Sequence, residues 1–229
     1  MEQLNNETMI YLFLLFLEII ILFFLSRAIS RTLSRFFPIH VLSSLFFPGV
    51  VIHELSHLLA AAIMFVKVGE IEFRPKVAEG KLKLGSVEIA KTDPIRRVII
   101  GFAPVFTGIL LILGIAYFVS NNLAFFQANQ AYITILAALG IVYILFAISN
   151  TMFSSNKDME GTLELLIVVL IVFSALYFIG FRFPDYFTKI LFSEKLLDLI
   201  QTSSMFLLAP IVIDLVILGI VKILADARR

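Results

Sequence analysis

Long apolar segments, separated by short polar ones, run through most of the chain. A helix needs roughly 20 residues to cross about 30 Å of hydrocarbon. Six segments reach that length, at approximately residues 9–29, 39–66, 95–120, 130–150, 161–181 and 199–224. No repeat, low-complexity tract or interdomain linker separates them. The pattern predicts an all-α polytopic membrane protein with about six transmembrane helices, forming a single domain over residues 1–229.

The exception is the polar stretch 67–93, where apolar and charged residues alternate. Ile71 and Phe73 alternate with glutamate and arginine, and Leu82 and Leu84 alternate with lysine. A period of two, broken by proline and glycine, predicts two or three short strands. Because an open sheet edge cannot face lipid, we expect a small β-hairpin or sheet insertion at a membrane surface.

Composition agrees with the membrane assignment. Hydrophobic residues make up 60% of the chain and charged residues 15%, whereas soluble domains are nearer half apolar and a quarter charged. The lipid bilayer is therefore the expected environment, and a net charge of +1 gives no reason to expect a nucleic-acid partner. The chain has no cysteine, which excludes disulfides and thiolate ligands or nucleophiles. The first apolar segment lacks a basic start and a small-residue cleavage site, so it is expected to be a retained span.

Three ionisable residues stand inside the second apolar segment. His53, Glu54 and His57 form the motif H-E-x-x-H. On a helix, residues i and i+4 share a face, so both imidazoles can reach one zinc ion. Glu54 can then accept a proton from a water whose pKa the metal lowers. The alternative is a pair of interfacial histidines on an ordinary helix end, but ionisable groups inside a span are costly and usually functional.

A catalytic zinc site needs a third protein ligand and one open position. His40 precedes His53 by 13 residues, about 20 Å along a helix, and is expected at the interface. Asp158, just after the fourth apolar segment, is the favoured third ligand. Glu160 and Glu164 lie near it and are the alternatives.

The order and spacing of these residues resemble the site-2 protease family of intramembrane zinc metalloproteases. In that family a segment of the form NxxPxxxLDG follows the HExxH helix two spans later. Asn150 and Asp158 have that eight-residue spacing in SNTMFSSNKDMEG. Phe153 stands at the position of the proline, Lys157 at that of the leucine, and Gly161 follows the aspartate by three residues instead of one.

A second segment extends the resemblance, which covers residues 39–161. GFAPVFTG is similar to the family's GPxxN turn. Pro104 matches the proline, whereas Ala103 stands at the position of the glycine and Thr107 at that of the asparagine. No role is carried over to these positions.

The resemblance implies a zinc endopeptidase that cleaves a transmembrane protein substrate in or near a membrane span. Zn²⁺ would be held by His53, His57 and Asp158, and Glu54 would act as general base and then as general acid. Asn150 would bind the substrate or the developing oxyanion; the alternative is a helix-packing amide. The strands within 67–93 would either hold an extended substrate by β-augmentation or form a purely structural hairpin.

Two other functions remain open from the sequence. A non-proteolytic zinc-binding membrane protein of the same fold would keep the zinc site without hydrolysis. A metal transporter would need discontinuous helices and further ligands near the bilayer midplane. Glu18 and Asp214 are the only indications of such ligands. We expect these two carboxyl groups to pair with neighbouring helices. Oligomeric state is not indicated.

Lysine and arginine counts give the orientation in the membrane. With a cytoplasmic N-terminus, six of the 18 fall in outer segments and the other twelve in cytoplasmic ones. The count predicts a multi-pass protein whose N-terminus and active-site side are cytoplasmic, although Arg27, Arg31 and Arg35 after the first span favour the reverse. In the third span, glycines that include Gly108 and Gly114 are expected to permit close helix packing.

Overall fold

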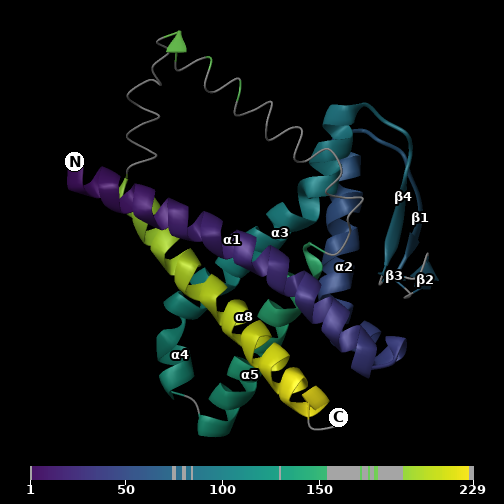
Figure 1. The fold of residues 1–229 in the computed structure, drawn as a ribbon. Helices are drawn as coiled ribbons and strands as arrows, with labels where there is room; N and C mark the ends of the chain where they lie inside the picture. The colour runs from purple at the N-terminus through teal and green to yellow at the C-terminus, as the bar shows by residue number, and fades with distance from the viewer. Residues whose placement is uncertain are drawn as a thin grey trace.

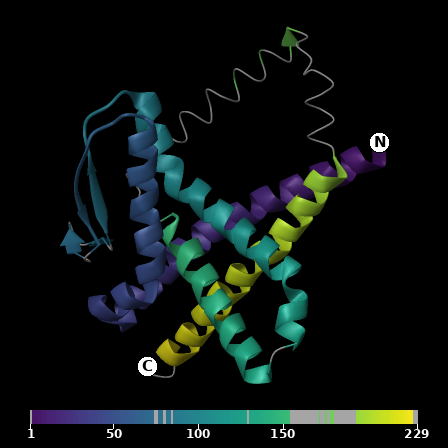
Figure 2. The ribbon, with the colours of Figure 1, turned by 180° about the vertical axis from the view of Figure 1, so that it is seen from behind.

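The computed structural model describes residues 2–73, 76–78, 81–83, 85–128, 130–153, 171, 175, 178–179 and 193–226. Five long helices dominate this part of the chain, with short strands beside one of them (Figures 1 and 2). The long helices are α1 (Glu2–Phe36), α2 (Ile39–Ile63), α3 (Pro94–Asn121), α5 (Ala131–Thr151) and α8 (Glu194–Asp226), and the short α4 (Leu123–Ala128) lies between α3 and α5.

All five long helices are long and apolar enough to cross a membrane. They confirm five of the six expected spans and suit a multi-pass membrane protein. The expected span at 161–181 lies almost entirely outside the described residues.

Helix α1 is longer than the apolar pattern predicted. Its 35 residues correspond to about 52 Å at 1.5 Å per residue, well beyond the hydrocarbon thickness. The apolar run ends near residue 29, but arginine, serine and leucine all continue a helix. The helix ends only at Phe36, shortly before Pro38, which is the N-cap of α2.

The helices cross around two buried apolar clusters. One joins α1, α3, α5 and α8 and includes Leu22, Val105, Ile112, Ile148 and Leu207; the other joins α1, α2, α5 and α8 and includes Ile29, Leu42, Phe46, Phe146 and Val221. Large apolar side chains also cover the outside of the bundle, among them Phe13, Phe24, Met205 and Ile223. An outer surface of this kind is what a lipid environment requires.

Small residues set how closely α2, α3 and α5 approach. A Cβ on Gly49 of α2 would collide with Thr151 Oγ1 and a backbone carbonyl of α5. A Cβ on Gly108 of α3 would lie 2.9 Å from Met152 Sδ, which confirms the close packing expected there. For Gly114 the described residues show no such packing, because none of them lies within 4 Å of a Cβ at that position.

The polar insertion forms four short strands, where two or three were expected. β1 (Val68–Glu72) pairs antiparallel with β4 (Ser86–Ile89), and β2 (Lys76–Ala78) pairs antiparallel with β3 (Lys81–Lys83). These strands do not extend beyond the end of α2. They lie along its outer side, while α3, α5 and α8 lie on the other (Figures 1 and 2). The position beside α2 was not part of the expectation, and the location of the strands at a membrane surface stays a prediction.

The return from the strands into the bundle is capped. Asp93 is the N-cap of α3, with its Oδ1 accepting a hydrogen bond from the Arg96 backbone N–H at 3.0 Å. That bond lowers the pKa of the Asp93 carboxyl. Pro94 at the first helical position suits its fixed φ. The cap fixes where α3 starts, and α3 faces the histidines of α2.

Candidate functional site

The HExxH motif lies in α2, and its residues, His53 to His57, precede the end of the helix at Ile63 by about 9–15 Å along the axis. All three motif side chains are buried, with exposed fractions of 4% for His53, 5% for Glu54 and 4% for His57. The structure thus places them inside a membrane-length helix, as expected, and not at an exposed helix end.

The two imidazoles converge as ligands of one ion would. His53 Nε2 and His57 Nε2 are 3.2 Å apart, at hydrogen-bond distance, and the ring planes are inclined by 85°. An ion about 2.05 Å from both nitrogens would see them at an angle of about 103°, close to the tetrahedral angle of zinc sites. These two residues therefore fit Zn²⁺.

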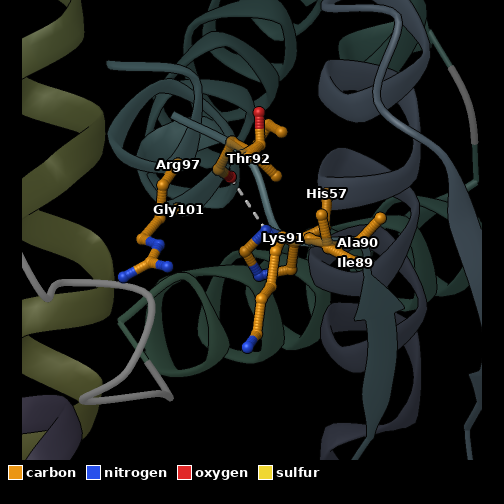
Figure 3. A pocket seen from close by; sticks show the side chains of 8 residues that line it. His57, Ile89, Ala90, Lys91, Thr92, Arg97 and Gly101 are labelled. Carbon is orange, nitrogen blue, oxygen red and sulfur yellow. Dashed lines mark hydrogen bonds between the residues drawn. The ribbon is translucent and has the colours of Figure 1, made fainter. Parts of the chain in front are cut away.

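A hydrogen bond to α3 fixes the form of His57. Its Nδ1 lies 2.9 Å from the backbone oxygen of Ile100, and the dashed line in Figure 3 marks this bond. A carbonyl oxygen can only accept, so Nδ1 carries the proton and Nε2 keeps its lone pair. Metal-binding histidines commonly make such a bond with the nitrogen that does not face the ion. His57 is therefore preset to bind through Nε2.

Glu54 lies against the backbone that enters β4. A Cβ built on Gly85 would be 2.6 Å from Glu54 Oε1 and 2.9 Å from Val50 Cγ1. Only a glycine lets the strand come this near to the helix. In the sequence Gly85 predicted no more than a strand break, although a glycine inside an alternating segment can also mark a close backbone approach.

A pocket of about 160 Å³ opens beside His57. Its walls come from the end of β4, the connection to α3 and the first turns of α3 (Figure 3); they are Ile89, Ala90, Lys91, Thr92, Arg97, Ile100 and Gly101. Lys91 and Arg97 are exposed, so the pocket has cationic side chains on its outer side.

The opposite side of the histidine pair faces α5. A narrow crevice next to His53 is lined by Thr151 and Met152, at the end of α5, and by Pro104 and Gly108 of α3. The end of α5 thus lies at the proposed metal site. Asp158, which follows it by seven residues, lies outside the described residues.

Other acidic candidates do not complete a ligand set in the described part of the chain. Glu160 and Glu164 also fall outside it, and within it no group of three histidine, cysteine, aspartate or glutamate side chains could hold a metal ion. His40 is exposed in the first turn of α2, far from His53, as expected.

Asn150 lies at the contact between α5 and α8. Its Nδ2 donates to Phe146 O at 3.0 Å and to Asp214 Oδ1 at 2.8 Å, and its side chain is almost fully buried. Both amide hydrogens are therefore engaged. Its Oδ1 has no hydrogen-bond partner among the described residues. In this arrangement Asn150 offers an acceptor and no free donor, which argues against direct donation to an oxyanion.

The two isolated carboxyl groups pair across helices. Asp214 on α8 accepts from Asn150, and Glu18 on α1 accepts a 2.7 Å hydrogen bond from Ser204 Oγ on α8. Interhelical pairing was the expectation for both, and it is confirmed. The partners themselves, 64 and 186 residues apart in the chain, had no signal in the sequence.

Comparison with known proteins returns no match among protein-family models, curated proteins or solved structures.

Proposed function

We propose that this chain is an intramembrane zinc endopeptidase that hydrolyses a peptide bond in or near a transmembrane segment of another membrane protein. The observation that supports it best is the histidine pair. The two Nε2 atoms lie 3.2 Å apart in a buried turn of an apolar helix, and His57 is anchored through Nδ1. Asp158 is the proposed third ligand, reached through the segment that follows α5.

Glu54 is the proposed general base. Zinc supplies Lewis acidity, polarising the scissile carbonyl and lowering the pKa of a water molecule. Glu54 takes the proton from the attacking water and delivers it to the leaving amine. It immediately follows His53 in the helix, and Gly85 packs against its side chain, so its carboxylate is confined next to both the metal site and the strands.

The strands are the proposed substrate-holding element. A two-stranded sheet leaves an unpaired edge on each strand, and an open edge needs a partner other than lipid. An extended peptide that adds to the sheet would lie near Glu54, because the start of β4 contacts that residue. Asn150 Oδ1 is the proposed acceptor for a substrate backbone N–H.

We also propose that the N-terminus and the pocket beside His57 are on the cytoplasmic side. Lys91, Arg96 and Arg97 cluster near this pocket, and positive residues favour the cytoplasm. Helix α1 and helix α8 run in the same direction, so N and C lie at opposite ends of the bundle (Figures 1 and 2). Lys222, near the end of α8, therefore lies on the side opposite the N-terminus. It no longer belongs to the lysines and arginines counted as cytoplasmic.

The test compares wild type with Glu54→Gln. We expect both proteins to hold about one zinc by elemental analysis and only wild type to cleave a model transmembrane substrate in proteoliposomes. Equal cleavage by both would refute the general-base role. Zinc in wild type without cleavage of any of a panel of transmembrane substrates would favour the non-proteolytic zinc protein.

A further inference from the structure

Helix α3 contains a proline four residues after the carbonyl that anchors His57. Pro104 is buried inside α3, and in a regular α-helix its N–H would bond to the carbonyl of Ile100. Proline has no N–H and therefore cannot make that bond. The donor that meets the Ile100 oxygen is instead the Nδ1–H of His57, at 2.9 Å.

A similar arrangement is found in α2 at an exposed position. Pro48, inside α2, leaves the carbonyl of Ser44 without its helical donor. The Tyr143 hydroxyl approaches that oxygen at 3.4 Å, in an exposed position. The bond at Ile100 is shorter and buried, and its donor is a proposed metal ligand. The carbonyl that Pro104 leaves free thus binds a residue with a proposed role in the metal site.

We propose that Pro104 is a positioning residue for the metal site, acting through the Ile100 carbonyl on His57. By withholding a backbone donor, it leaves this oxygen free to hold the Nδ1–H form and the orientation of the ring. With an N–H at position 104, the backbone and the imidazole would compete for the oxygen. The Nε2–H form, which has no lone pair facing His53, would then be populated.

This inference rests on the proposed zinc site. It predicts that adding a backbone N–H at position 104 lowers the affinity for zinc. Removing an outer partner of a metal-binding histidine typically lowers metal affinity by about 10- to 100-fold. Pro104→Ala introduces the competing N–H, so its zinc affinity, measured by competition with a chelator, should fall by that factor. Pro210→Ala is the matched control, since Pro210 is also buried within a helix, α8, and lines neither the pocket nor the crevice at the histidines.

A second readout reports the histidine itself. The chain has only three histidines, so ¹⁵N-histidine labelling gives few signals and the apo proteins can be compared directly. Wild type and Pro210→Ala should show His57 with its proton on Nδ1. Pro104→Ala should show a mixture of the two neutral forms.

L-lactic acid at position 104 separates the missing N–H from the proline ring. It has the alanine methyl group but an ester oxygen in place of the N–H. We expect this variant to recover the zinc affinity and the Nδ1–H form that Pro104→Ala loses. Unchanged affinity and tautomer in Pro104→Ala would overturn the proposal, as would equal failure of the alanine and lactate variants, because the ring alone would then be required. If wild type binds no zinc, the proposed function fails, whereas the tautomer comparison still tests the action of Pro104 on His57.

Discussion

A single added methyl group at Gly85 tests whether the strands hold Glu54 in place. In Gly85→Ala the new Cβ would lie 2.6 Å from Glu54 Oε1 and 2.9 Å from both Glu54 Cγ and Val50 Cγ1. Ordinary contacts start near 3.4 Å, so the carboxylate or the strand must move by about 0.8 Å. Such overpacking costs about 1–3 kcal/mol, and a misplacement of about 1 Å at a reacting group can cost about 100-fold in rate. We expect kcat to fall by about two orders of magnitude.

The assay measures zinc content and cleavage of one transmembrane substrate in the same preparations. Zinc should stay at the wild-type level, because Gly85 contacts Glu54 and neither histidine is among the nearest atoms to its Cβ. Gly69→Ala is the matched control. Gly69 lies in β1, the strand paired with β4, and its new Cβ would lie 3.1 Å from Glu88 Cβ and 3.2 Å from Glu88 Oε2. This exposed contact requires a shift of only a few tenths of an ångström.

The reasoning is refuted if Gly85→Ala cleaves at the wild-type rate while remaining folded. It is refuted equally if Gly69→Ala loses as much activity as Gly85→Ala. In that case the hairpin as a whole would matter, and the contact with the carboxylate would not.

Two further substitutions test the frame around the site. Gly49→Ala places a methyl group against α5 and should destabilise the protein by about 1–3 kcal/mol, seen as a lower melting temperature in detergent. Gly114→Ala, whose Cβ would contact none of the described residues, should not, and equal effects would contradict the packing described. Asp158→Ala should lose zinc by elemental analysis while Glu160→Ala and Glu164→Ala keep it; loss in either glutamate variant instead would identify that glutamate as the third ligand.

The sequence predicted those features that depend on local patterns. Hydrophobic length located five helices to within a few residues at most of their ends, because crossing hydrocarbon requires an apolar run. The C-terminal end of α1 was missed because Arg31 and Arg35 interrupt the apolar pattern without ending the helix. The i, i+4 spacing of His53 and His57 was enough to place both imidazoles on one face.

Features that depend on tertiary contacts could not be predicted in the same way. Alternation showed that strands exist in 67–93 but not that they would lie beside α2, since that position depends on the absence of a side chain at Gly85. The motif spacing identified Asn150, whereas its hydrogen-bond partner Asp214 lies on α8, far along the chain. Pro104 was noticed only as part of a resemblance, and its effect on His57 depends on how α2 packs against α3.

The most direct test of the central claim is X-ray absorption at the zinc edge, with elemental analysis, on purified wild type and His57→Ala. The geometry of the histidine pair predicts about one zinc per wild-type chain, with two imidazole nitrogens at about 2.0–2.1 Å, and strongly reduced zinc in His57→Ala. Absence of zinc from wild type, or an unchanged zinc spectrum in His57→Ala, would contradict the account.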